Sequence, residues 1–442
     1  MRGHLENALY GVADYAAFPL GMLAVAPVLL HKLGAAQFGI WAFAMALANT
    51  GAIIASGFGD ANIQQIAAAR STNNFTRIES CVRATLGVHI VIGATLGLAG
   101  YLAAPWMALH ITGDQPSLVG CIVSLRIASI VVFVRALETV VVSTQRAFER
   151  YSEAVRISAG VRVLSLTAAA GLAAGGFSVE QIVGCTALLL IGGTLVQFVR
   201  LSRFVSRRCL VPGFERTATR ELVRIGIFTW AQATAGVIFG QADRLFVGLT
   251  FGAVAVGAYS LCMQVAQPIA GSAASALHFI FPYIARRSAG EQVQTLQRPL
   301  MRTFICNLVL VLGESIALLA FGEWFLRRWA GPAVISHSTH LLPLAVLGAA
   351  CAGLAVTGTY AMLALAQARP VVWVTAASGI AMLSSMAWLQ GRYGIIGVAT
   401  SRIVFGLTSL AIYLPLLRYF RRNSVASSVA STLQLTNVQE GV

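Results

Sequence analysis

Charged residues are scarce in this sequence: they make up 11% of its 442 residues, and only one of them is a lysine, Lys32. A soluble domain carries about 25% charged residues, so this chain lacks the polar surface that a protein of its size needs in water. Hydrophobic residues make up 57% of the chain, and the mean hydropathy is +0.77. The composition therefore predicts an integral membrane protein.

Several motifs of enzymes and metal sites are also missing. The chain has no G-x-x-x-x-G-K-[ST] loop, which argues against ATP as the direct energy source. It has neither H-E-x-x-H nor G-x-S-x-G, which argues against a membrane hydrolase. Its seven cysteines are dispersed without C-x-x-C spacing, as expected of buried thiols. We therefore expect no catalytic residues, no metal site and no cofactor.

Long apolar runs, by contrast, are abundant. We predict twelve of them, each near the length of about 20 residues that a transmembrane helix needs. Strands of a transmembrane barrel would be about half as long, and apolar and polar residues would alternate along them. The first six predicted spans lie near 9–31, 40–59, 84–104, 118–142, 156–175 and 181–200, and the second six near 225–249, 254–282, 303–322, 341–367, 371–390 and 395–417.

Basic residues are unevenly distributed among the connecting loops. Loops after even-numbered spans, together with the two chain ends and the adjoining span ends, carry 22 basic residues, whereas loops after odd-numbered spans carry four. Basic residues accumulate on the cytoplasmic side of membrane proteins. We therefore expect a multi-pass membrane protein with both termini in the cytoplasm. The net charge of +15 follows this topology, so the lipid bilayer is an expected partner and nucleic acid is not.

The sequence contains an internal repeat. Residues 34–41 read GAAQFGIW and residues 252–259 read GAVAVGAY, an offset of 218 residues. The same offset relates Ile66-Ala67 to Ile284-Ala285. A twofold repeat within a very apolar chain is typical of secondary transporters.

The most basic loop separates the two copies of the repeat. We expect an N-terminal six-helix lobe over 1–200, a basic cytoplasmic linker over 201–224, a C-terminal six-helix lobe over 225–420 and a disordered cytoplasmic tail over 421–442. Each half has an even number of spans, so both insert in the same orientation and the repeats are parallel. The predicted fold class is an all-α polytopic membrane protein with two parallel six-helix lobes.

Ionisable residues within the predicted spans are the candidates for function. A charge at bilayer depth costs at least about 2.5–3.5 kcal/mol, so it normally faces a cavity or a partner. The candidates are Asp14, Arg126, Arg135, Glu138, Arg162, Asp243, Arg244, Glu314 and Arg402, with His89 and His278 as further positions.

Several of these candidates also have structural explanations. Arg135 and Glu138 are three residues apart, so they can form an ion pair on one helix face. Arg162 lies near the end of its span and can reach the membrane surface. Arg126 lies nine residues before Arg135, about 13 Å along an ideal helix and on its opposite face. Both arginines can therefore meet one cavity only if the helix bends.

Segments in both halves resemble the polysaccharide-repeat flippases, the Wzx-like exporters of O-antigen and exopolysaccharide in Gram-negative bacteria. In the first half the similar residues are Leu33-Gly34, Phe38 to Trp41, Gly57 to Gly59 and Ile66-Ala67. In the second half they are Asp243 to Gly248, Gly252, Val256 to Tyr259, Pro268, Pro282 and Ala285-Arg286. The resemblance covers spans one, two, seven and eight.

The resemblance implies membership of the multidrug/oligosaccharidyl-lipid/polysaccharide exporter superfamily, with two lobes in a MATE-like V shape. It further implies that an undecaprenyl-pyrophosphate-linked oligosaccharide moves from the cytoplasmic to the periplasmic leaflet of the bacterial inner (plasma) membrane by alternating access. Polysaccharide polymerase and chain-length proteins are then candidate partners. The lipid II flippases of this superfamily carry arginines in their first two spans and usually have fourteen spans. Here those two spans contain only Asp14 as a charge, which disfavours a peptidoglycan precursor as substrate.

On this hypothesis the arginines bind the anionic headgroup, because guanidinium bonds two phosphate oxygens at once. Carboxylates are candidates for coupling to H⁺ or Na⁺, since a buried carboxylate can take up a cation in one state and release it in the other. The predicted headgroup contacts are Arg126, Arg135, Arg244 and Arg402, and the predicted coupling residues are Asp14, Glu138, Asp243 and Glu314.

Three alternatives stay open. A cation-coupled multidrug exporter of the same superfamily would favour carboxylates over arginines in its cavity, since its substrates are usually cationic. A membrane-embedded polysaccharide polymerase or ligase would have a similar length, but we expect such an enzyme to have a large periplasmic loop with catalytic Arg or His, and no such loop is found. A non-transporting scaffold for polysaccharide assembly is the third.

Overall fold

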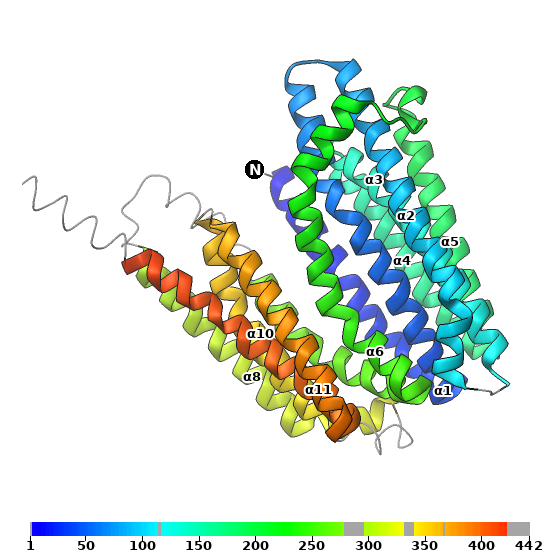
Figure 1. Cartoon of the computed structure of the whole chain (residues 1–442), viewed down its shortest axis with the longest axis vertical. Coiled ribbons are helices and arrows are strands. Elements are labelled where there is room, and N and C mark those ends of the chain that lie inside the picture. Colours follow the sequence, from blue (N-terminus) through cyan, green and yellow to red (C-terminus); the bar gives the residue numbers. More distant parts are fainter. Residues whose placement is uncertain (1, 114–115, 278–295, 331–339, 366, 422–442) are drawn as a thin grey trace, which may run out of the picture. The chain divides into compact units, whose positions relative to one another are not determined.

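The computed structural model describes residues 2–113, 116–277, 296–330, 340–365 and 367–421, and within these ranges the chain is helical and contains no strand (Figure 1). The side chains of residues 2–20 are not described. The predicted tail beyond Arg421 and the candidate His278 therefore lie outside the described residues, as does the side chain of Asp14. The helical content agrees with the predicted all-α class.

The helices follow the predicted apolar runs. They are α1 (Arg2–Ser71), α2 (Phe75–Thr112), α3 (Leu118–Ala147), α4 (Tyr151–Ala174), α5 (Val179–Leu201), α6 (Arg216–Leu277), α8 (Gln297–Ala330), α10 (Leu341–Ala364) and α11 (Ala368–Ser409), with short 3₁₀ turns η1 (Arg207–Leu210) and η3 (Leu410–Ile412). Over the described residues, nine helical segments are long and apolar enough to cross a membrane.

Three of these helices are too long for one crossing, and a glycine interrupts each of them. α1 has 70 residues and would extend about 105 Å if straight, against a hydrocarbon core of about 30 Å. The interruptions lie at Gly34, Gly252 and Gly394, whose φ angles of 80°, 83° and 57° belong to the left-handed region that glycine adopts without steric cost. Dividing α1, α6 and α11 there yields twelve segments, which confirms the predicted fold of about twelve spans.

The two copies of the repeated octapeptide contact each other reciprocally. Gly39 lies so close to Ala253 that a methyl group on Gly39 would overlap the Ala253 carbonyl. In the other direction, a methyl group on Gly257 would lie 3.3 Å from the carbonyl oxygen of Ala35. The offset of 218 residues converts the first contact into the second. The motif thus supplies a bend at its first glycine and a close backbone contact at its second.

Compactness divides the chain into two units. Unit 1 comprises Met1–Leu261 and Leu326–Ser338, and unit 2 comprises Cys262–Phe325 and Thr339–Val442. Unit 1 contains α1 to α5 and most of α6. These units are defined by contacts in space, whereas the predicted boundary at residues 201–224 divides the sequence into two repeats. The two six-helix lobes and the basic linker between them therefore stay a prediction.

Each unit has its own apolar core. In unit 1, Ile66, Val141 and Leu201 form one buried cluster that joins α1, α3 and α5. In unit 2, Met362 and Ile412 belong to a cluster that joins α10 to the end of the chain's described part. Burial of such side chains fixes how the helices of a unit are rotated relative to one another, and that rotation decides which polar residues meet.

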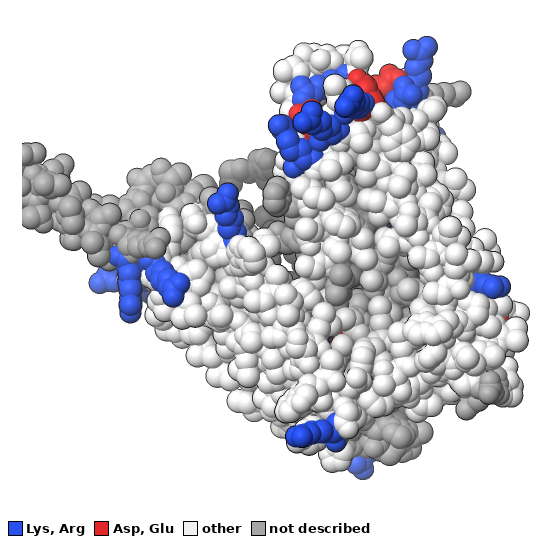
Figure 2. All heavy atoms as spheres, viewed as in Figure 1, with Lys and Arg blue, Asp and Glu red and all other residues white. Residues whose placement is uncertain are grey.

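Charges gather at one end of unit 1, while most of the face seen below that end carries none (Figure 2). Ion pairs link the helix ends there: Arg77 at the start of α2 pairs with Glu221 near the start of α6 at 3.0 Å. Arg200 at the end of α5 pairs with Glu153 near the start of α4 at 3.4 Å. The loops predicted to be cytoplasmic therefore share one end of unit 1.

Candidate functional site: a charged cavity among α1, α3 and α4

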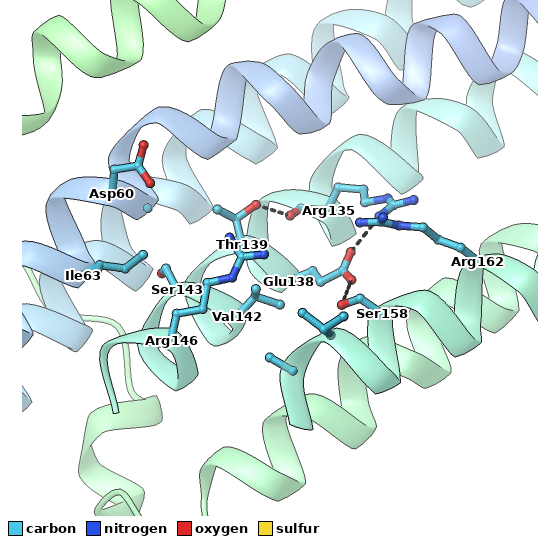
Figure 3. Close-up of a pocket in the computed structure, with 13 residues that line it drawn as sticks. Asp60, Ile63, Arg135, Glu138, Thr139, Val142, Ser143, Arg146, Ser158 and Arg162 are labelled. Carbon is cyan, nitrogen blue, oxygen red and sulfur yellow. Dashed lines mark hydrogen bonds and ion pairs between the residues drawn. The ribbon is translucent and has the colours of Figure 1, made fainter. Parts of the chain in front are cut away.

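A cavity of about 350 Å³ lies among α1, α3 and α4 in unit 1 (Figure 3). Among the described side chains, its charged lining consists of Arg135, Glu138 and Arg146 on α3, Arg162 on α4 and Asp60 on α1. Three arginines against two carboxylates leave one excess positive charge. A cavity of this size can hold a small anionic group.

Helical periodicity explains which side chains line the cavity. Residues three or four positions apart in a helix share a face, and the lining residues follow that spacing over more than three turns of α3. They are Arg135, Glu138, Thr139, Val142, Ser143 and Arg146 on α3, and Ala154, Val155, Ser158 and Arg162 on α4. One face of each helix therefore turns its polar residues toward the same space.

An ion pair lies at the centre of the charged lining. A guanidinium nitrogen of Arg135 lies 3.0 Å from Oε2 of Glu138, and the two side chains are only 20% and 13% exposed. In Figure 3 the guanidinium groups of Arg135 and Arg162 end near each other, and Glu138 reaches the same part of the cavity. Arg135 and Glu138 therefore form the predicted ion pair and also line the cavity.

A chain of buried side chains holds the second carboxylate oxygen of Glu138. The Ser158 hydroxyl donates to Oε1 at 3.3 Å, and the Gln197 amide on α5 donates to Ser158 at 3.0 Å. The amide of Gln145 donates in turn to the Gln197 carbonyl oxygen at 2.9 Å. Each donor in this series of hydrogen bonds is directed toward the carboxylate of Glu138, and hydrogen bonds that run in one direction polarise and strengthen one another.

Three other predicted residues of unit 1, Arg126, Asp243 and Arg244, are not part of the described lining of this cavity. Arg126 stacks on Tyr101 of α2, with 4.8 Å between the guanidinium carbon and the ring centroid. Asp243 is fully buried and accepts a hydrogen bond of 2.5 Å from the hydroxyl of Tyr259. These two residues flank the interruption at Gly252, so the bond joins both parts of α6. Arg244 donates to the side chain of Gln241 at 3.3 Å.

Two predicted residues belong to unit 2. Glu314 on α8 accepts a hydrogen bond of 2.8 Å from Ser272 of α6. Arg402 on α11 packs beside Gly348 of α10, where a methyl group on the glycine would lie 3.0 Å from Cβ of the arginine. The structure therefore brings together Arg135 and Glu138 of the predicted set. The roles of all these residues in substrate binding or coupling, including those of Arg135 and Glu138, stay predictions.

Sequence reasoning missed part of the cavity lining. Asp60 and Arg146 were not singled out, because they lie near span ends where a charge needs no explanation, and Arg162 was interpreted as reaching for the surface. One signal was available: Arg135, Glu138 and Arg146 recur at intervals that keep one helix face charged for three turns. Ser158 and Gln197 gave no signal, since isolated polar residues are common in apolar helices.

The family described as polysaccharide biosynthesis protein matches residues 29–326. Among curated proteins, no match is found. Among solved structures, the chain is similar to the lipid II flippase MurJ in an inward closed conformation, with a TM-score of 0.74 and 14% identity over 95% of this chain and 91% of that one.

Two MATE transporters show the same likeness. An inward-facing multidrug resistance MATE family transporter of the MOP superfamily matches with a TM-score of 0.67 and 16% identity over 96% of each chain. The eukaryotic MATE transporter AtDTX14 matches with a TM-score of 0.58 and 12% identity over 95% of this chain and 99% of that one. At such identities the likeness concerns the fold. Because the family match spans more than half of its residues, the chain belongs to the polysaccharide biosynthesis protein family, and its fold is that of the MOP superfamily.

Proposed function

We propose that the protein is a flippase for an undecaprenyl-pyrophosphate-linked oligosaccharide repeat unit. It moves this substrate from the cytoplasmic to the periplasmic leaflet by alternating access, for exopolysaccharide or O-antigen synthesis. The observation that carries the proposal is the cavity lined by Arg135, Arg146 and Arg162 within a bundle of apolar helices. Membership of a polysaccharide biosynthesis family supports it.

The chemistry of the headgroup explains why such a cavity is needed. A pyrophosphate diester carries negative charge that is costly to bring into a membrane. Guanidinium groups offset that cost best, because each one remains charged and its fork can bond two phosphate oxygens. An excess of arginine over carboxylate favours an anionic headgroup over the cationic substrates of a multidrug exporter.

The remaining predicted residues complete the proposal at other points of the path. Arg126, Arg244 and Arg402 are proposed as further headgroup contacts, and Asp14, Asp243 and Glu314 as candidates for coupling to H⁺ or Na⁺. Asp243 is the best defined of these, since it is fully buried and its carboxylate oxygen is bonded to Tyr259. Exchange of that bond for a bound cation would alter the connection across Gly252.

The test is to delete the gene and to ask which leaflet holds the lipid-linked repeat unit. We expect it to accumulate in the cytoplasmic leaflet. Accumulation of unpolymerised units on the periplasmic side would contradict a flippase and indicate a polymerase. Complementation with a triple variant, Arg135→Gln, Arg146→Gln and Arg162→Gln, should restore little transport. As a matched control, replacement of the exposed Arg203 by Gln should restore it fully.

A further inference from the structure

We infer that Glu138 is a built-in counter-ion that occupies, on Arg135, the place of a phosphate group of the ligand. Binding at this cavity is then an exchange of one anion for another. The inference rests on the proposed function, because it takes a phosphorylated headgroup as the ligand, and it adds how the empty site keeps its arginine neutralised.

The geometry of the ion pair leaves no room for a second anion on Arg135. Glu138 holds Arg135 at 3.0 Å in a setting where both side chains are mostly buried. A phosphate oxygen that bonded the same guanidinium group would lie next to the carboxylate. Two anions at that separation repel strongly where water is scarce, so the phosphate can bond Arg135 fully only after Glu138 withdraws from it.

The carboxylate of Glu138 has a second anchor that can hold it when it withdraws from Arg135. Its other oxygen, Oε1, accepts from Ser158 at 3.3 Å, and Gln197 supports Ser158 from α5 at 3.0 Å. This anchor does not involve Arg135, so the carboxylate keeps one donor while it releases the arginine. Ser158 and Gln197 are 6% and 1% exposed, so they stay part of the protein interior throughout.

Two further arginines can receive the incoming anion. Arg146 and Arg162 line the same cavity from different turns and different helices. A phosphate group that enters the cavity therefore meets two positive charges besides Arg135, one on α3 and one on α4. Once Glu138 no longer bonds Arg135, a diphosphate meets three arginines, and Asp60 is the other carboxylate of the described lining.

A purely structural role for Glu138 predicts the opposite result. If the carboxylate served to hold Arg135 in its working position, its neutralisation would misplace the arginine and weaken anion binding. If it is the counter-ion, neutralisation removes a competitor and strengthens anion binding. The sign of one change in affinity therefore separates the two roles.

The experiment measures binding of inorganic pyrophosphate to the purified full-length protein in detergent by calorimetry. We expect Glu138→Gln to bind about tenfold more tightly than the wild type and Arg135→Gln about tenfold more weakly, since each changes one charge contact by about 1.4 kcal/mol. Glu153→Gln is the matched control. It removes the carboxylate of another i,i+3 pair, formed with Arg150 at 3.4 Å outside the cavity, and should leave affinity unchanged.

A second comparison covers the case in which Glu138→Gln does not fold with Arg135 left charged. The double variant Arg135→Gln/Glu138→Gln removes both charges, and we expect it to bind pyrophosphate more tightly than Arg135→Gln alone. Unchanged or weaker binding after loss of Glu138, in either background, overturns the inference. Absence of pyrophosphate binding to both the wild type and the Glu138 variant overturns it as well. The leaflet assay after gene deletion decides the flippase separately, because it asks where the lipid-linked unit accumulates and does not depend on how Arg135 is neutralised.

Discussion

Asn62, a fully buried residue of α1, joins three helices through its amide group. Its nitrogen donates to the hydroxyl of Ser143 at 2.9 Å and to that of Thr144 at 3.1 Å, both on α3. Its oxygen accepts from Thr85 of α2 at 3.0 Å. Since Ser143 also lines the cavity, this amide fixes the wall of the site as well as the packing of unit 1.

Replacement of Asn62 by Ala should therefore destabilise unit 1. Loss of a buried amide bonded on both sides costs about 1–3 kcal/mol, which thermal unfolding of the purified protein would show as a lower midpoint. The partly exposed Thr400, whose hydroxyl bonds the carbonyl of Ile396 in its own helix, provides the control as Thr400→Ala. Equal midpoints for the two variants would contradict the bracing role of Asn62.

Cys209 in η1 illustrates how burial controls reactivity outside the spans. The residue is 3% exposed, and burial raises the pKa of its thiol from the ordinary 9.0 to about 11. At pH 8 only about one such thiol in a thousand is a thiolate, the reactive form. We expect Cys209 in the folded protein to resist a maleimide at pH 8 and to react readily after denaturation in SDS. Fast labelling of the folded protein would contradict its burial.

The same shift links this thiol to the pH dependence of folding. A pKa that is higher in the folded than in the unfolded state contributes stability in full below the unfolded value. For Cys209 that contribution is complete below pH 9 and is lost as the pH rises through about 11. Cys209→Ala should therefore lessen any loss of stability measured between these pH values.

At the scale of helices, the repeated motif controls both a bend and a contact. Gly39 admits the carbonyl of Ala253, and nothing larger than hydrogen fits there without displacement. Overpacking of this kind costs about 1–3 kcal/mol, so Gly39→Ala should lower the thermal midpoint of the protein. Gly192 in α5 has open space around it, and Gly192→Ala should be neutral or slightly stabilising. Similar effects of the two changes would rule out the close contact.

The sequence was sufficient to predict the helices but not the cavity. Runs of apolar residues predict spans because the bilayer demands a certain length and internal hydrogen bonding. They also placed Gly34 and Gly252 between spans, where the structure has its interruptions. Continuity of α1 and α6 across those glycines was not predicted, because a single left-handed residue suffices where a loop was expected.

The cavity depends on contacts that a local pattern cannot encode. The spacing of Arg135 and Glu138 predicted their ion pair, which involves only one helix. The contribution of Asp60 from α1 and of Arg162 from α4 depends on how three helices are rotated against one another. Tertiary packing sets that rotation, through clusters such as the one around Ile66 and Val141, and a single sequence does not reveal it.

At the scale of the whole molecule, the charge pattern and the repeat both predict that the two halves cross the membrane in the same orientation. Six predicted spans in each half bring both copies of the motif into the membrane in the same direction. In unit 1, ion pairs already join the helix ends that this topology assigns to the cytoplasm. An inverted repeat would instead have an odd number of spans per half and would place corresponding loops on opposite sides.

Reporter fusions test this topology loop by loop. Turns at Gly113 and Gly176 follow odd-numbered spans, so alkaline phosphatase inserted there should be active in the periplasm. Glu149, Val211 and Gln367 lie in loops after even-numbered spans, and green fluorescent protein fused after these residues should fluoresce because it folds in the cytoplasm. The last of these fusions is decisive for the repeat: if the second half were inverted, phosphatase rather than fluorescence would be found at Gln367 while the first-half pattern remained unchanged.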